Sequence, residues 1–219
     1  MELPGGIFFA LRSRVWGGGM AFYDPALPGR AAARAYLLSH GQFADVLAQE
    51  MHRPVGGEHD LSEALATGRQ TLGPGTYETI LRVGTADGVP MLTFTGPFGS
   101  AEARRSAPSA AYLSMLGRGL RESHRWPPAR IAGYLAGRPG AHGAWTPAAV
   151  TALLRKGHTR PRITSHGSSE PEVHGIVTRS SEVTASDRAG ASPSSLNGTE
   201  PWAARPSTNV VSPPTSRPR

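Results

Sequence analysis

Cysteine is absent from this chain of 219 residues, and long apolar runs are absent as well. Without thiols the chain has no disulfides, no thiol nucleophile and no Cys-ligated zinc. No apolar run approaches the length of about 18 residues that spans a bilayer. The segment "GIFFALRS" is too short for the apolar core of a signal peptide, and no basic residues precede it. We therefore expect a soluble, cytosolic protein.

Lysine is nearly absent, because Lys156 is the only one, so the net charge of +7 is carried almost entirely by arginine. Nucleic-acid binders gather their basic residues on one helix or stripe. Here arginines such as Arg12, Arg34 and Arg82 are scattered along the chain. Arg, Ala, Gly and Pro are all frequent, and a GC-rich genome would explain this composition, including the arginine content. A nucleic-acid binder is therefore the weakest of our functional hypotheses.

The composition changes near residue 157. Residues 158–219 are dominated by Ser, Thr, Pro, Gly and Arg and hold few large apolar side chains. Such a segment cannot bury enough apolar surface to offset the entropy of ordering it. We predict one folded domain, residues 1–157, followed by a disordered tail, residues 158–219.

Within residues 1–157 the pattern predicts about five strands and about five helices. Because the helices do not alternate regularly with the strands, the predicted fold class is α+β. Ser39 with Gln42, and Asp60 with Glu63, have the spacing of helix capping boxes. Asp87-Gly88 predicts a β-hairpin turn. The expected strands are 6–10, 15–24, 33–39, 76–84 and 89–96, and the expected helices are 40–53, 59–72, 107–123, 127–137 and 146–156.

Most chemistry-bearing patterns in the sequence have an ordinary explanation. The glycines 17–19 lack the Lys and Ser or Thr of a phosphate-binding loop, so they indicate a bulge or bend, with a ligand-lining role as the alternative. The histidines form no H-E-x-x-H pair, so we expect no metal site. No G-x-S-x-G occurs in the folded part, and Ser109 has the position of a helix cap.

Glu50 is the exception. Phe43, Val46 and Leu47 precede it by seven, four and three residues, so all four lie on one apolar helix face. Burial and the C-terminal end of a helix dipole both disfavour a charged carboxylate, so both would raise its pKa toward that of a general base. The alternative is a frayed helix end that points Glu50 to water.

Four motifs occur in order: "VWGGGMAFYD", a helix ending in "VLAQEM", a strand led by Tyr77, and "PSAAYLSMLGRG" with Pro108, Ser109, Tyr112 and Gly119. In this order and spacing they resemble the gamma-glutamylcyclotransferase-like family over residues 5–137. The resemblance implies a small mixed β-barrel with flanking helices and release of 5-oxoproline from a gamma-glutamyl compound. It places Glu50 as the catalytic acid and base, and Tyr77, Tyr112, Gly17 and Gly18 as substrate-binding residues.

Two departures from the family pattern stand out. Met51 replaces the glycine that follows the catalytic glutamate, and the Y-G-S-N loop of the family's first strand is absent. We therefore expect either a start codon assigned too late or a truncated paralogue.

The hypotheses are thus a cyclotransferase-like enzyme or its remnant, and a non-catalytic binding module on the same fold, ahead of the nucleic-acid binder. Proteins with this resemblance are often labelled histone deacetylases, but no zinc-ligand pattern supports an amide hydrolase or deacetylase of that kind. We expect a small gamma-glutamyl compound as the ligand, no cofactor, no metal and no membrane partner.

Overall fold

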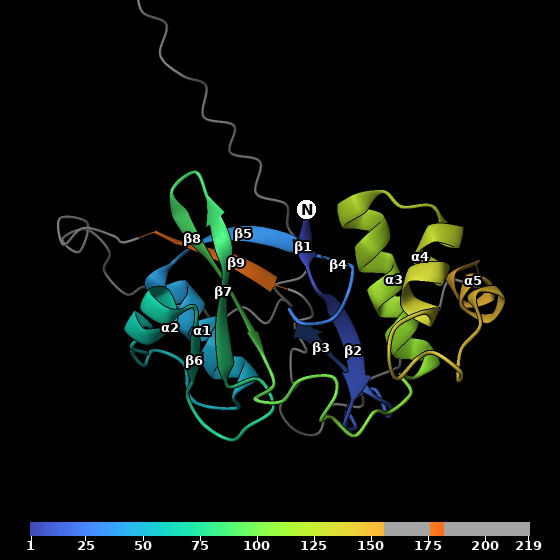
Figure 1. The fold of residues 1–219 in the computed structure, drawn as a ribbon, viewed down its shortest axis with the longest axis horizontal. Helices are drawn as coiled ribbons and strands as arrows, with labels where there is room; N and C mark the ends of the chain where they lie inside the picture. Colours follow the sequence, from blue (N-terminus) through green and yellow to red (C-terminus); the bar gives the residue numbers. More distant parts are fainter. Residues whose placement is uncertain (156–175, 182–219) are drawn as a thin grey trace, which may run out of the picture. The chain divides into compact units, whose positions relative to one another are not determined.

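The computed structural model describes residues 1–155 and the strand at residues 176–181. These residues form helices and mainly antiparallel sheets, which confirms the α+β class (Figure 1). The strands are β1 (Glu2–Pro4), β2 (Gly6–Ala10), β3 (Met20–Asp24), β4 (Arg30–Ala32), β5 (Arg34–Ser39), β6 (Arg69–Thr71), β7 (Thr79–Ala86), β8 (Val89–Thr95) and β9 (Ile176–Ser181). The helices are α1 (His40–Glu50), α2 (Ser62–Thr67), α3 (Ala110–His124), α4 (Pro128–Ala136) and α5 (Pro147–Arg155).

The predicted β-barrel is wrong for the described residues, because the strands form three separate sheets. β1 pairs with β4, β2 pairs with β3, and five strands assemble in the order β5-β9-β8-β7-β6. A barrel requires every strand to share a ladder with two neighbours. Here the outer edge of β2 is held by loops instead: Phe9 N donates to Pro139 O, and Ser106 N donates to Phe9 O.

The β2–β3 ribbon separates two hydrophobic clusters. Phe8 and Phe22 pair across the ribbon and face a cluster that includes α1 and the five-stranded sheet. Phe9 and Ala21 pair at the next position and face a cluster built on α3, α4 and α5. Because successive strand residues point to opposite faces, "GIFFA" is buried on both sides.

The second predicted strand is shorter than expected, because β3 begins at Met20 and residues 14–18 form a turn and bend. The Ser13 hydroxyl accepts hydrogen bonds from Val15 N and Trp16 N, which bends the chain before the strand can start. Gly17 completes the turn with φ of 77°, a value that side chains disfavour. The expected bend at the glycines is therefore confirmed.

Helix α1 begins as predicted. The Ser39 hydroxyl accepts from Gln42 N, and the Gln42 side chain accepts from Ser39 N, so the capping box is present.

Removing this cap has a measurable expected cost. Ser39→Ala should lower the free energy of unfolding by about 1 kcal/mol, because Gln42 N at the helix start loses the hydroxyl that accepts from it. Chemical denaturation measures the change. Ser123→Ala is the matched control, since that serine is exposed on α3, and it should stay within about 0.5 kcal/mol. Equal losses in both variants would contradict the capping role.

The second predicted helix is shortened at both ends, and its capping box is wrong. The N-cap of α2 is Leu61, without a side-chain hydrogen bond. Asp60 instead accepts from Ser62 N at 2.9 Å, and this bond is the main reason that the pKa of Asp60 lies below its usual value. Gly68 ends the helix with φ of 90°, and residues 69–71 pair with β7 as strand β6.

The predicted hairpin is confirmed. β7 and β8 are antiparallel and join at Asp87-Gly88, where φ values of 51° and 79° are those of a type I′ turn.

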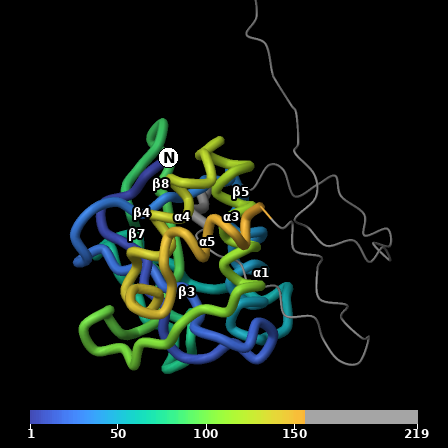
Figure 2. Tube along the Cα trace, turned by 90° about the vertical axis from the view of Figure 1, so that its right-hand side faces the viewer, coloured from blue at the N-terminus to red at the C-terminus, as the bar shows by residue number. Residues whose placement is uncertain are grey.

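The three helices predicted from residue 107 onward are also confirmed, as α3, α4 and α5, and they pack on one another (Figure 2). Of the predicted tail, the structure describes only residues 176–181, as β9; its other residues lie outside the described part of the chain.

Candidate functional site

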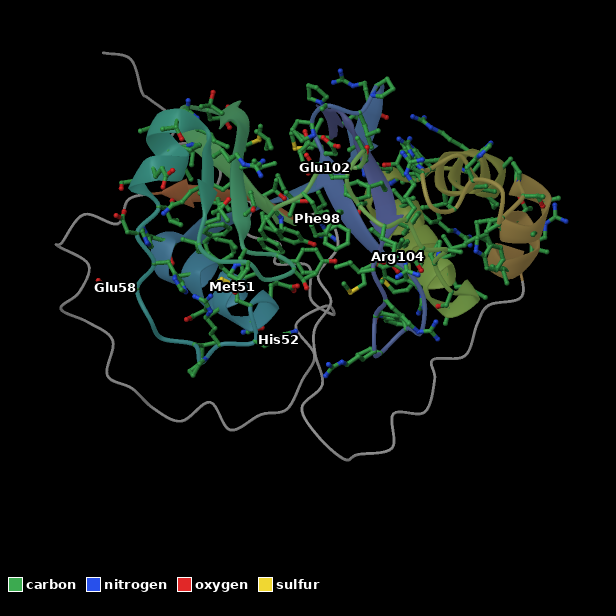
Figure 3. The ribbon with its side chains drawn as sticks, turned by 60° about the horizontal axis from the view of Figure 1, so that its bottom comes forward. Met51, His52, Glu58, Phe98, Glu102 and Arg104 are labelled. Carbon is green, nitrogen blue, oxygen red and sulfur yellow. The ribbon has the colours of Figure 1, made fainter. Side chains whose placement is uncertain are left out.

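Glu50 is buried, with 6% of its surface exposed at the last position of α1. Leu47, one helical turn earlier, and Met51, the next residue, belong to the hydrophobic cluster on the α1 side of the β2–β3 ribbon. Figure 3 shows Met51 and His52 where the helix ends. The alternative of a frayed helix end with Glu50 in water is therefore wrong, because the side chain is buried.

Tyr77 belongs to the same hydrophobic cluster as Leu47 and Met51. It precedes β7, is 6% exposed, and its ring stacks on Phe22 with a centroid distance of 5.1 Å. Its hydroxyl donates a hydrogen bond of 3.0 Å to Ala21 O.

Tyr112 reaches the same residue from the other side of the ribbon. It lies in the first turn of α3, where its backbone N donates to the Ser109 hydroxyl. The side chain is fully buried, with ring centroids 6.2 Å from Phe9 and 5.8 Å from Trp16. Its hydroxyl accepts a hydrogen bond of 3.2 Å from Ala21 N. The structure thus brings the two predicted tyrosines together at Ala21.

The register of the ribbon explains why Ala21 needs these partners. Phe9 turns its own N–H and C=O away from β3, so Ala21, opposite it, turns both of its groups toward the outer edge of β3. An unpaired strand edge is costly when buried. The two phenols close this edge, one as donor and one as acceptor. The resemblance gave both tyrosines a substrate-binding role, and their hydrogen bonds to Ala21 were not predicted from the sequence.

Gly17 and Gly18 differ in what their lack of a side chain permits. A Cβ on Gly17 would meet nothing within 4 Å, whereas a Cβ on Gly18 would lie 2.5 Å from Ser109 N. Gly18 therefore allows the loop before β3 to touch the N-terminus of α3, the helix that carries Tyr112. Contact of either glycine with a substrate stays a prediction.

An ion pair beside the site was missed from the sequence. Arg53, three residues after Glu50, lies 2.7 Å from Glu78, the neighbour of Tyr77. The second oxygen of the buried Glu78 carboxylate accepts from Gly75 N at 3.1 Å. The pair thus ties the end of α1 to the loop that carries Tyr77. The available signal was an acid, Glu78, at the start of an otherwise apolar strand pattern, but its partner is distant in sequence.

The two tyrosine hydroxyls support a prediction about stability. Tyr77→Phe and Tyr112→Phe should each lower the free energy of unfolding by about 1–3 kcal/mol, because each removes the phenol that satisfies a buried peptide group of Ala21. Tyr36→Phe is the control, as this half-buried phenol makes no hydrogen bond to another of the described side chains or backbone groups, and it should change the free energy by less than about 0.5 kcal/mol. Denaturant unfolding measures the free energy of unfolding of each variant. Equal losses in all three variants would contradict the role of the two phenols in closing the strand edge.

The described residues contain neither a cluster of metal-binding side chains nor a membrane-spanning helix. No three His, Asp or Glu side chains among residues 1–155 gather in a way that could hold a metal ion. None of the helices in the described part of the chain combines the length and apolar character needed to cross a bilayer.

Comparisons of this chain with protein-family models, with curated proteins and with solved structures found no match. The resemblance described above therefore rests on sequence motifs alone. The geometry adds that its three side-chain residues, Glu50, Tyr77 and Tyr112, are all buried, and that the two tyrosines hydrogen-bond the same residue, Ala21.

Proposed function

We propose that this protein is a gamma-glutamylcyclotransferase-like enzyme that uses Glu50 as its acid and base. The observation that carries the proposal is the burial of Glu50, an acid that closes the apolar face of α1 at its C-terminal end. Burial and the helix end both disfavour the charged form, so such a carboxylate is suited to proton transfer near neutral pH.

The reaction moves one proton through one carboxylate. The α-amine of a gamma-glutamyl compound attacks its own γ-carbonyl carbon, and the new N–C bond closes a five-membered ring. Glu50 accepts the proton that the attacking amine loses. It then returns this proton to the leaving amine as the original amide C–N bond breaks. The products are 5-oxoproline and an amine or amino acid, and no proton is gained or lost overall.

The tyrosines fit this proposal as residues that shape the pocket. Tyr77 gives its hydroxyl proton to Ala21 O. Tyr112 uses a hydroxyl lone pair to accept from Ala21 N, the opposite role at the same residue. The roles of the two phenols are therefore complementary.

The test is release of 5-oxoproline from a series of gamma-glutamyl dipeptides by the full chain, followed by chromatography. The proposal expects a rate well above that of buffer and linear in enzyme concentration. A rate equal to that of buffer for every dipeptide would overturn it, and would leave the binding module on the same fold as the better hypothesis.

A further inference from the structure

Strand β9 has an unusual place in the five-stranded sheet, because it is the last of the described strands along the chain yet lies between β5 and β8 (Figure 1). It pairs in parallel with β5 over six residues, from Arg34 opposite Ile176 to Ser39 opposite Ser181. It pairs antiparallel with β8 over only two, Met91 opposite Arg179 and Leu92 opposite Thr178. In the described residues, β9 is the only strand that joins β5 to the sheet.

The position that β9 fills borders the hydrophobic interior. Leu92, which pairs with β9, is fully buried, and Met91 is 6% exposed. Helix α1 contacts both β5 and β9. An empty position between β5 and β8 would therefore leave two unpaired strand edges next to apolar side chains, which is the template that an extended peptide binds by strand addition.

The segment that fills this position is joined to the rest of the domain by a long connection. α5 ends at Arg155 and β9 begins at Ile176, so 20 residues lie between them. An extended chain of that length reaches roughly 66–72 Å. The segment Ile176-Val177-Thr178 has three consecutive β-branched residues, which favour strands, within a region otherwise rich in Ser, Pro and Gly.

We propose that the position between β5 and β8 is a strand-binding site, which residues 176–181 fill reversibly and which accepts the same extended segment in trans. Recognition comes from main-chain hydrogen bonds on both sides, parallel to β5 and antiparallel to β8. The 20-residue connection sets the occupancy, since a linker supplies its own segment at an effective concentration on the order of millimolar.

The first test uses the full chain with Thr178→Pro. Thr178 pairs with Tyr36 on β5 and Leu92 on β8, and proline removes the N–H that a central strand must donate. Hydrogen exchange of the β5 amides should become about tenfold faster or more, while β2 and α3 keep parental protection. Thr199→Pro, the same change outside the strand, should leave β5 unchanged. Parental protection of β5 in Thr178→Pro would overturn the proposal.

The second test supplies the strand in trans. A synthetic peptide of residues 172–184, added to the Thr178→Pro chain, should restore protection of β5 in a concentration-dependent way. The same peptide carrying Thr178→Pro should not restore it. The unchanged parent should respond little, because its own segment occupies the site. Failure of the unmodified peptide to restore protection would contradict binding in trans.

A third test does not depend on the proline variant folding. Because the chain has no cysteine, Leu37→Cys with Arg179→Cys creates a single thiol pair at facing positions of β5 and β9. Facing strand residues lie within the Cα separation that a disulfide spans. Mild oxidation should cross-link this pair much faster than the control pair Leu37→Cys with Thr199→Cys. Equal rates would show that the strand does not occupy the position. None of these readouts involves 5-oxoproline, so they stand apart from the proposed reaction.

Discussion

Replacing Glu50 with glutamine is expected to lower the rate of 5-oxoproline release by about 10²- to 10⁴-fold, the usual contribution of a positioned acid or base. Glutamine keeps the size and shape of the side chain but cannot take up the amine proton. Because the same group accepts and returns the proton, both ring closure and departure of the amine should slow. The loss should appear mainly in kcat, since the ground-state substrate contacts remain.

The control for this variant is the same substitution at an exposed acid. Glu63→Gln, in the first turn of α2, changes the charge identically but lies outside the apolar cluster around Glu50. It should keep parental activity within about twofold, because remote charges are screened at physiological salt. Far-UV circular dichroism and the urea midpoint check that Glu50→Gln remains folded. A folded Glu50→Gln variant with parental kcat would show that Glu50 is not the acid and base.

Removing the side chain of Leu47 is expected to lower the free energy of unfolding by about 2–5 kcal/mol. Leu47 is fully buried, one helical turn before Glu50, so Leu47→Ala loses apolar burial and leaves a cavity where α1 packs into the cluster of Phe8, Phe43 and Tyr77. The cavity also loosens the end of α1, so 5-oxoproline release should fall in parallel with stability.

The matched control has the same substitution on the surface. Leu37 of β5 is 65% exposed, and Leu37→Ala should shift the free energy of unfolding by no more than about 0.5 kcal/mol. Urea denaturation of both variants gives the comparison. If Leu47→Ala lowered the free energy of unfolding as little as Leu37→Ala, the apolar face of α1 would not be part of the core. The placement of Glu50 as a buried residue at the end of that face would then fail.

Local patterns predicted the parts of this fold that depend on neighbours in sequence. The Ser39–Gln42 box and the Asp87-Gly88 turn satisfy backbone groups within a few residues, and both were confirmed. The Asp60–Glu63 box has the same spacing, but Asp60 bonds Ser62 N instead, because α2 starts two residues after Asp60 with Leu61 as its cap. The capping-box spacing thus identifies possible caps, and only a pair whose first residue directly precedes the helix forms one.

The strand assignment of residues 15–24 failed for a comparable reason. Alternation favoured one long strand, but the Ser13 hydroxyl captures Val15 N and Trp16 N before the ladder begins. The barrel failed on a larger scale, because closure depends on which strand edges meet, and a single strand's composition does not encode that. β9, from a segment predicted to be disordered, lies in the largest sheet.

The sequence by itself determined that Glu50 lies on an apolar helix face, since the 3.6-residue period of Phe43, Leu47 and Glu50 requires it once the helix forms. Only the tertiary structure decided that this face is buried to its last residue, and that Tyr77 and Tyr112, from segments 35 residues apart, both bond the Ala21 peptide. The physical reason is that burial and edge pairing are relations between distant segments, fixed when two hydrophobic clusters close on the β2–β3 ribbon.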